Sequence, residues 1–199
     1  MAKRGQYAKG MAKRQEILDA ALDLFAQNGY DRTSVREIAR LVGLSQAGLL
    51  HYFTSKEDLF AEVLKRRDAR NEERYHTYRG EQGDDPVTTE GLVSIVEHNA
   101  AEPGLVRLYV SMSAESTEVD SPARGFFEER YRKLRTDLAA DVRRKQEHGQ
   151  IAEDLDPDVV ASLMIAAADG LQIQWLLDPD GTDMGEELEA MWAAFRRVT

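Results

Sequence analysis

Apolar side chains recur along this chain mostly with the 3.6-residue period of an α-helix. The first clear stripe ends at Asn28-Gly29, and glycine is typical just past a helix end. The members of this stripe are Ile17, Leu18, Ala21, Leu22 and Phe25. No segment alternates apolar and polar residues for long enough to predict a strand. The pattern predicts an all-α protein of about nine helices.

Two short apolar stripes follow, in residues 34–42 and 45–53, with Gly43 between them. Thr33 or Ser34 can cap the first helix, and Glu37 lies three residues after Ser34, as in a capping box. Ser45 can cap the second helix, which is expected to run to about Phe53. Two short helices joined by a turn are typical of a helix-turn-helix, whose second helix lies in the DNA major groove. A simple corner in a helical protein is the alternative.

The apolar positions of these segments predict which side chains face outward. The residues expected to hold the pair against the rest of the domain are Ile38, Ala39, Val42, Leu49, Phe53 and Leu59. The residues left facing outward are Ser45, Gln46, Ala47, Gly48, Leu50 and His51. Small residues allow the helix to approach base edges, and Gln46 can pair with adenine. Tyr52 and Lys56 are placed to hold phosphates, and Arg36 is a further phosphate or base contact.

Charge is divided unevenly along a chain whose net charge is −10. Residues 1–56 carry nine Lys/Arg and five Asp/Glu, a net of +4, so the remainder carries −14. The first part can therefore approach a polyanion that the second part repels. Residues 1–12 form a basic tail, which we expect to be unordered and solvated rather than an arm that contacts DNA. Met11 offers an alternative start.

The stretch RQEILDAALDLFAQNGYDRTSVREIARLVGLSQAGLLHYFTSKEDLF closely resembles the N-terminal domain of the TetR (tetracycline-repressor-like) family of bacterial regulators. The matching motifs lie at Ile17–Tyr30, Thr33–Ala39, Gly43–Phe53 and Ser55–Leu59, in the family's order and spacing. The resemblance implies a three-helix helix-turn-helix domain, which we place at residues 13–72, with the recognition region at 34–53. Residues 73–199 would then form a larger helical domain for effector binding and dimerisation.

The resemblance also implies a homodimer that binds a partly palindromic double-stranded DNA operator, with half-sites roughly 34–36 Å apart. It implies that bases are read by Ser45, Gln46, Ala47, Gly48 and His51. It implies that the DNA backbone is held by Thr33, Ser34, Arg36, Tyr52 and Lys56. Many relatives have an aromatic residue or threonine where this chain has Leu50 and Gly48, so the operator sequence does not follow from these residues.

The larger domain is expected to pair two copies and to bind a small-molecule effector. The segment from Pro157 to Leu177 is apolar around most of its circumference, which predicts burial on two sides. The residues expected at the dimer interface are Val160, Leu163, Ala167, Leu171, Leu188, Met191, Trp192 and Phe195. The residues expected to line the effector pocket are His98, Tyr109, Met112, Phe126, Phe127, Met164, Gln172 and Trp175. A plain monomeric core is the alternative for both sets.

The predicted function is a sequence-specific transcriptional regulator, a repressor that an unknown effector releases from DNA. The chain has no cysteine, which excludes disulfides, thiolate metal sites and a cysteine nucleophile. Its four histidines lie in no metal-ligand spacing, and the common catalytic and nucleotide-binding motifs are absent, so we expect no enzyme activity, catalytic residue, metal or cofactor. Without an 18-residue apolar run or a signal segment, we expect no membrane association and a cytoplasmic location. A helical interaction protein and an activator or ligand-independent regulator are the alternatives.

Overall fold

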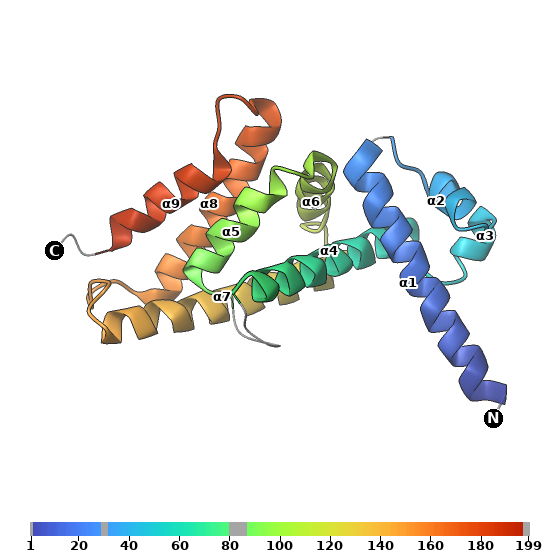
Figure 1. Cartoon of the computed structure of the whole chain (residues 1–199), viewed down its shortest axis with the longest axis horizontal. Helices are drawn as coiled ribbons and strands as arrows, with labels where there is room; N and C mark the ends of the chain where they lie inside the picture. Colours follow the sequence, from blue (N-terminus) through green and yellow to red (C-terminus); the bar gives the residue numbers. More distant parts are fainter. Residues whose placement is uncertain (1, 29–31, 80–86, 197–199) are drawn as a thin grey trace. The chain divides into compact units, whose positions relative to one another are not determined.

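The computed structural model describes residues 2–28, 32–79 and 87–196, and their side chains except those of residues 2–6, 8 and 71–79. The described residues form nine helices and no strand, which confirms the all-α prediction (Figure 1). The helices are α1 (Ala2–Asn28), α2 (Val35–Leu41), α3 (Gln46–Leu49), α4 (Lys56–Arg79), α5 (Thr89–Asn99), α6 (Pro103–Glu115), α7 (Arg124–Glu147), α8 (Pro157–Leu177) and α9 (Met184–Phe195).

Contacts group the helices into two compact units. Unit 1 contains the chain up to Arg70 together with Glu102–Phe126, and unit 2 contains Asn71–Ala101 together with the chain from Phe127 onward. Unit 1 therefore includes α6, which packs against α1. The sequence pattern did not predict this return, because an amphipathic stripe shows which side of a helix is buried but not which element covers it.

The core of unit 1 is built from the apolar stripes that the sequence predicts. Ile17, Leu22 and Phe25 of α1 are buried, as are Leu59 and Phe60 of α4. The rings of Phe25 and Phe60 meet edge to face, with their centroids 5.0 Å apart, an arrangement that aromatic pairs favour. This contact fixes α4 against α1 and gives the two short helices a rigid base.

Two expectations about element ends are wrong. Helix α1 begins at Ala2, so residues 2–12 are helical and not an unordered tail. This segment is rich in Ala, Lys, Arg and Gln, which favour helix.

Helix α3 ends at Leu49 and does not reach Phe53. The carboxylate of Asp58 accepts hydrogen bonds from the backbone N–H and hydroxyl of Thr54. The Ser55 hydroxyl also caps α4 by accepting the Asp58 N–H at 3.0 Å. Together these bonds favour a turn between α3 and α4 instead of a continued helix.

Unit 2 is organised around α8, which packs against α5 and α9. Asp156 caps α8 through the N–H groups of residues 158 and 159, and proline occupies its first turn, where its missing N–H costs nothing. The buried side of α8 includes Val160, Met164 and Leu171. Helix α8 is, by length and composition, long and apolar enough to cross a membrane, contrary to the expectation that no such helix exists. Its packing against α5 and α9 buries 39% of the apolar window, so these neighbours cover only part of this helix.

Candidate nucleic-acid interface

Helix α2 forms the first half of the candidate interface, and its boundaries arise from local chemistry. The Ser34 hydroxyl caps the helix by accepting the Glu37 N–H at 3.2 Å. Val35, Ile38 and Ala39 are buried, so the opposite side of the helix is exposed. These caps and buried positions are those predicted from the sequence.

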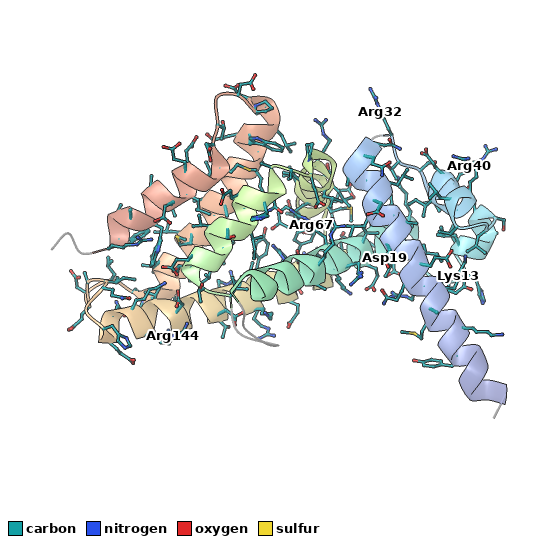
Figure 2. All side chains as sticks on the ribbon, in the orientation of Figure 1. Lys13, Asp19, Arg32, Arg40, Arg67 and Arg144 are labelled. Atoms are coloured by element: carbon teal, nitrogen blue, oxygen red, sulfur yellow. The ribbon has the colours of Figure 1, made fainter. Side chains whose placement is uncertain are left out.

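The turn after α2 is held by backbone geometry and by a side chain from α1. Gly43 has φ of 70°, a left-handed conformation that favours glycine. The Leu44 N–H donates to the Ala39 carbonyl at 2.8 Å. Lys13 of α1 donates to the Val42 carbonyl at 2.6 Å, so α1 fixes the start of the turn (Figure 2). The entry to α3 is therefore determined by several independent bonds.

Helix α3 is one turn long and presents a small, polar surface. Ser45 caps it by accepting the Gly48 N–H at 3.0 Å. Leu49 is 0% exposed and anchors the helix, whereas Ser45, Gln46 and Ala47 are exposed. Because Leu49 points inward and the outward residues are short, the backbone of α3 can approach a base edge closely.

Gly48 is half-buried and has its own steric reason to be small. A Cβ at this position would lie 3.2 Å from the Ser45 Oγ, tighter than ordinary van der Waals contact. A larger residue would therefore press on the capping hydroxyl. Leu50, which the sequence analysis placed outward, is half-buried in the structure.

The predicted backbone-contacting residues surround α3, and the structure leaves all but one of them accessible. Ser34, Arg36 and Lys56 are exposed, and Tyr52 is half-buried. Thr33 is the exception, because it is only 5% exposed.

The remaining predicted base-reading residue, His51, is exposed immediately after α3. Its ring meets that of Tyr52 in a T-shaped contact, with centroids 6.2 Å apart. Lys56 lies over the Phe60 ring, with Nζ 5.1 Å from the centroid. The local packing of Tyr52 and Lys56 thus restrains two side chains next to α3.

Sequence reasoning missed Arg40. It is exposed on α2, four residues after Arg36, and projects outward (Figure 2). Residues four apart share a face of a helix, so α2 presents two guanidinium groups on one side. The spacing of Arg36 and Arg40 in the sequence was the signal that could have identified it.

Three ion pairs join α1 to α4 beneath this surface. Arg14 contacts Glu62 at 2.6 Å, and Arg66 contacts Asp19 at 2.8 Å. Further along, Arg70 lies 3.7 Å from Asp23 and 2.6 Å from Glu102, which precedes α6. These pairs recur along both helices and set the register of α4 against α1.

Glu62 is the partly buried carboxylate of this series. Burial alone would raise the pKa of Glu62, but hydrogen bonds and charge attraction from Lys65 and Arg14 lower it below its ordinary value. The carboxylate is therefore ionised at neutral pH and can hold Arg14. The Arg14 guanidinium also lies 5.0 Å from the centroid of Phe53, just after the candidate interface.

The residues predicted for the effector pocket divide between the two units. Unit 1 contains Tyr109, Met112 and Phe126, of which the first two are buried. The Arg67 guanidinium, itself buried, lies 5.4 Å from the Tyr109 ring centroid (Figure 2). In unit 1, Tyr109 and Met112 therefore serve at least as core.

Unit 2 contains the other predicted pocket residues, His98, Phe127, Met164, Gln172 and Trp175. His98 is exposed and contacts the Ser94 carbonyl at 2.9 Å. The other members of this set are buried. Gln172 donates to the Ala168 carbonyl at 3.2 Å, but its own Oε1 is buried and has no hydrogen-bond partner among the described residues.

The predicted dimer-interface residues also separate into two sets. Val160, Leu171, Leu188 and Trp192 are buried within their own chain. Leu163 is 48% exposed, whereas Ala167, Met191 and Phe195 are half-buried. The large apolar residues that α8 exposes are Val159, Leu163, Ile173 and Leu177. The exposed face of α8 therefore includes positions next to those predicted, because Val160 and Leu171 lie on the side of the helix that is buried within its own unit.

Comparison with known proteins matches both parts of the chain to models of bacterial transcriptional regulators. A model of the tetR family of bacterial regulatory proteins matches residues 17–63, and a model of the BetI-type transcriptional repressor C-terminal domain matches residues 89–197. The chain belongs to the TetR family. It is therefore a DNA-binding transcriptional regulator, and the model that matches its C-terminal half describes repressors.

Individual relatives match either most of the chain at low identity or a short part of it at higher identity. The HTH-type transcriptional regulator AcrR of Shigella flexneri is 27% identical over 182 residues, covering 87% of this chain and 83% of its own length. The regulator RutR of Escherichia coli is 50% identical, but over 54 residues, 27% of this chain and 26% of its own.

A solved structure extends the likeness to most of the chain. A putative transcriptional regulator from Saccharomonospora viridis, crystallised with choline, is 29% identical, with a TM-score of 0.70. The similarity covers 92% of this chain and 96% of that one. Among the residues that the structure of the present chain describes, no group of three or more His, Cys, Asp or Glu is arranged to hold a metal ion.

Proposed function

We propose that this TetR-family regulator acts as a homodimer that holds a partly palindromic operator and releases it when a small-molecule effector binds. The observation that carries the DNA-binding part is the exposed, small and polar surface of α3 above the buried Leu49. In this proposal residues 13–72 contact the operator, residues 73–199 bind the effector and pair the copies, and the protein acts in the cytoplasm, without catalysis.

The base-reading role falls to the exposed residues of α3 and to His51 just after it. Gln46 is the side chain suited to a bidentate bond with adenine, and Ser45 can donate or accept. Arg36 and Lys56 would bind phosphates on either side, together with Arg40. Tyr52 is accessible enough to add a hydroxyl contact. Thr33 is too buried to contribute more than its backbone groups.

The exposed apolar face of α8 supports pairing through this helix. Val159, Leu163, Ile173 and Leu177 follow one another at spacings of four, ten and four residues, each a sum of threes and fours, so they approximate one stripe. Ala190, Ala193 and Ala194 are exposed on α9 and are small enough to allow close helix approach. An exposed apolar stripe of this kind is typical of a protein interface. Two copies packed through α8 and α9 would form a four-helix bundle.

Gln172 is the residue that best supports an effector site in unit 2. Its buried Oε1 lacks a donor, and a buried acceptor without a partner is costly. A ligand with a hydroxyl or N–H group would satisfy it. Nearby in sequence, Asp169 accepts a hydrogen bond from Tyr131 at 2.7 Å, so a carboxylate is also present on this helix.

Choline is the first effector to test, because a neighbour with 29% identity was crystallised with it. It combines a hydroxyl, which can donate to Gln172, with a cation suited to the acidic part of the chain. To move a conformational population from 1:99 to 99:1, an effector must favour one state by about 5.5 kcal/mol. A weaker preference would give only partial release from DNA.

The experiment is operator binding by the purified protein, followed with a duplex of its own upstream region and with a random duplex at two salt concentrations. We expect tighter binding to the specific duplex and release by the effector. Gln172→Leu should bind DNA normally and respond less to the effector. If specific and random duplexes bind equally at both salt concentrations, this operator is wrong. If no duplex binds, the interaction-protein alternative is favoured instead.

A further inference from the structure

Unit 2 contains a cavity of about 400 Å³ that the operator and effector roles leave unused. It lies between the start of α5, the end of α7, the loop after α7 and the end of α9. Its lining consists of Glu90, Lys145, Gly149, Gln150, Ile151, Trp192 and Arg196. No residue of α8 lines it, so it is distinct from the surroundings of Gln172. The volume is within the range of small-molecule pockets.

The walls of this cavity are fixed by bonds among α5, α7 and α9. The Lys145 ammonium donates to Thr89 Oγ1 at 2.6 Å, to Glu90 Oε2 at 2.5 Å and to Asp141 Oδ2 at 2.7 Å. Trp192 Nε1 donates to Glu90 Oε1 at 3.4 Å. A β-bridge between Ile151 and Arg196 closes the loop onto the end of α9. The side chains at the cavity are thus preorganised.

Most of the charge around the cavity is already neutralised. Lys145 has three N–H groups and all three are committed, so it cannot bind an anion without breaking this cluster. Burial alone would raise the pKa of Glu90, but the hydrogen bond from Lys145, the backbone and the lysine charge lower it. Glu90 is therefore ionised when the cavity is empty.

Two charged groups retain capacity for a ligand. The Glu90 carboxylate is half-exposed, and its Oε1 receives only the long bond from the indole. Arg196 gives one N–H to Glu189 Oε1 at 2.7 Å, and its other guanidinium N–H groups have no acceptor among the described residues. The side chain of Arg196 is 42% exposed and lies 5.7 Å from the Trp192 ring centroid. The Glu90 carboxylate and the Arg196 guanidinium therefore both contact the buried Trp192 side chain and both retain capacity for a ligand.

We propose that this cavity binds a small zwitterion, of the α-amino acid type, with its carboxylate on Arg196 and its ammonium on Glu90. A simple anion would meet the Glu90 carboxylate, and a simple cation would meet Arg196 and Lys145. A molecule that carries both charges can pair with both Glu90 and Arg196. Repulsion from the like-charged group disfavours molecules that carry only one charge. Binding would join α5, the loop at 149–151 and α9.

Arg196 is the C-cap residue of α9 and lies beyond Ala190, Ala193 and Ala194, the exposed alanines of the proposed dimer face. Ligand binding at this site is measured without reference to the dimer or to DNA.

The test uses the full-length protein with Trp175→Phe, because the chain has two tryptophans and this change leaves Trp192 as the fluorescent reporter. The standard L-amino acids are the probes, and binding is followed by fluorescence and by the melting temperature. We expect at least one to bind saturably. For that amino acid, the matched amide and the matched acid without the amino group should each bind at least about tenfold more weakly, since each loses one charged hydrogen bond.

Substitutions distinguish binding in this cavity from a general stabilising effect of amino acids on the protein. Arg196→Ala and Glu90→Gln should each weaken binding at least about tenfold, and Arg196→Lys should retain part of it. Arg143→Ala, which removes an exposed arginine paired with Asp158, is the control and should bind normally. If no amino acid binds, if the deaminated acid binds equally well, or if Arg196→Ala binds like the parent, the proposal is overturned. Operator binding is measured separately, so its failure would leave this result intact.

Discussion

Helices α3 and α8 each expose a face, and the two faces differ in chemistry. Around the buried Leu49, α3 exposes Gln46 and Ala47, which are small or polar. Around the buried Met164, α8 exposes Val159 and Leu163, which are apolar. A polar, low-profile face fits a nucleic-acid groove, whereas an apolar stripe fits another protein surface. The uncovered face of a helix thus tells more about its partner than its overall hydrophobicity does.

The largest test of this comparison is a charge placed on the exposed face of α8. Leu163→Glu would bury an unpaired carboxylate in the proposed dimer, so we expect monomers. Operator affinity should fall on the order of 10²-fold or more, because a dimer binds both half-sites at once whereas each monomer binds only one. Light scattering gives the mass, and fluorescence anisotropy gives the affinity.

The control for that substitution is Val119→Glu, which changes an 81% exposed valine in unit 1. It should leave both mass and affinity unchanged. A Leu163→Glu protein that stays dimeric would show that the exposed apolar stripe of α8 is not the interface.

A core substitution beneath α3 should act through stability. Leu49→Ala removes a fully buried side chain and should lower the free energy of unfolding by about 2–5 kcal/mol. Leu41→Ala, at a position that is 55% exposed, should change it by about 0.5 kcal/mol or less. Urea unfolding followed by circular dichroism measures both. Equal effects would mean that α3 is not anchored through Leu49.

The cluster in unit 2 should make that unit sensitive to acid. Asp141 is buried, and although burial raises its pKa, bonds from Lys145 and Thr89 lower it below the ordinary value. The folded pKa of Asp141 lies below the ordinary value of 3.8, so the ionised carboxylate stabilises the fold at pH values above 3.8. This stabilisation is lost as the pH falls through the folded pKa.

Asp141→Asn should therefore be less stable than the parent at neutral pH, by about 1–3 kcal/mol. The difference should shrink as pH falls below the ordinary pKa of 3.8 and through the lower folded pKa, where the folded parent takes up the proton. Thermal melts between neutral and acid pH measure this. A difference that stays constant with pH would mean that the ionised form of Asp141 contributes nothing.

Removal of one base-reading side chain should have an effect of about 1–3 kcal/mol. Gln46→Ala should lose this much discrimination between operator and random DNA, because a bidentate base contact disappears. Gln15→Ala, exposed on α1, is the matched control. Competition binding with random duplex gives the ratio. Unchanged discrimination in Gln46→Ala would remove this residue from base reading.

The smallest effect should come from a phosphate contact. Lys56→Ala should weaken binding to all duplexes alike, and the log–log salt slope should become shallower by about 0.9 for each phosphate lost. Lys133→Ala, on an exposed position of α7, should leave the slope unchanged. A change in sequence preference instead of salt slope would assign Lys56 to base reading.

The parts of the molecule that the sequence predicted are those set by local chemistry. Ser34 and Ser45 cap the helices they were expected to cap, because a hydroxyl needs only the N–H two or three residues ahead. Leu49 was likewise placed inward by its spacing from its neighbours.

The parts that the sequence did not predict depend on distant elements. Lys145 meets Glu90 although 55 residues separate them, and no local pattern marks that pair. Trp192 was assigned to the dimer interface, but its own chain covers it completely. An amphipathic helix shows that a face is buried, and only the fold shows which element buries it.

Selection of binding sites from a random pool of DNA duplexes tests the central claim most directly. The wild-type protein and Gln46→Ala would be compared by sequencing the duplexes that each retains at moderate salt. We predict that the wild type enriches an inverted repeat with half-site centres about 10–10.5 base pairs apart or a multiple of this spacing, and that Gln46→Ala loses preference at one or two positions in each half. No enriched sequence with the wild type, or the same preference in both proteins, would contradict base reading by α3.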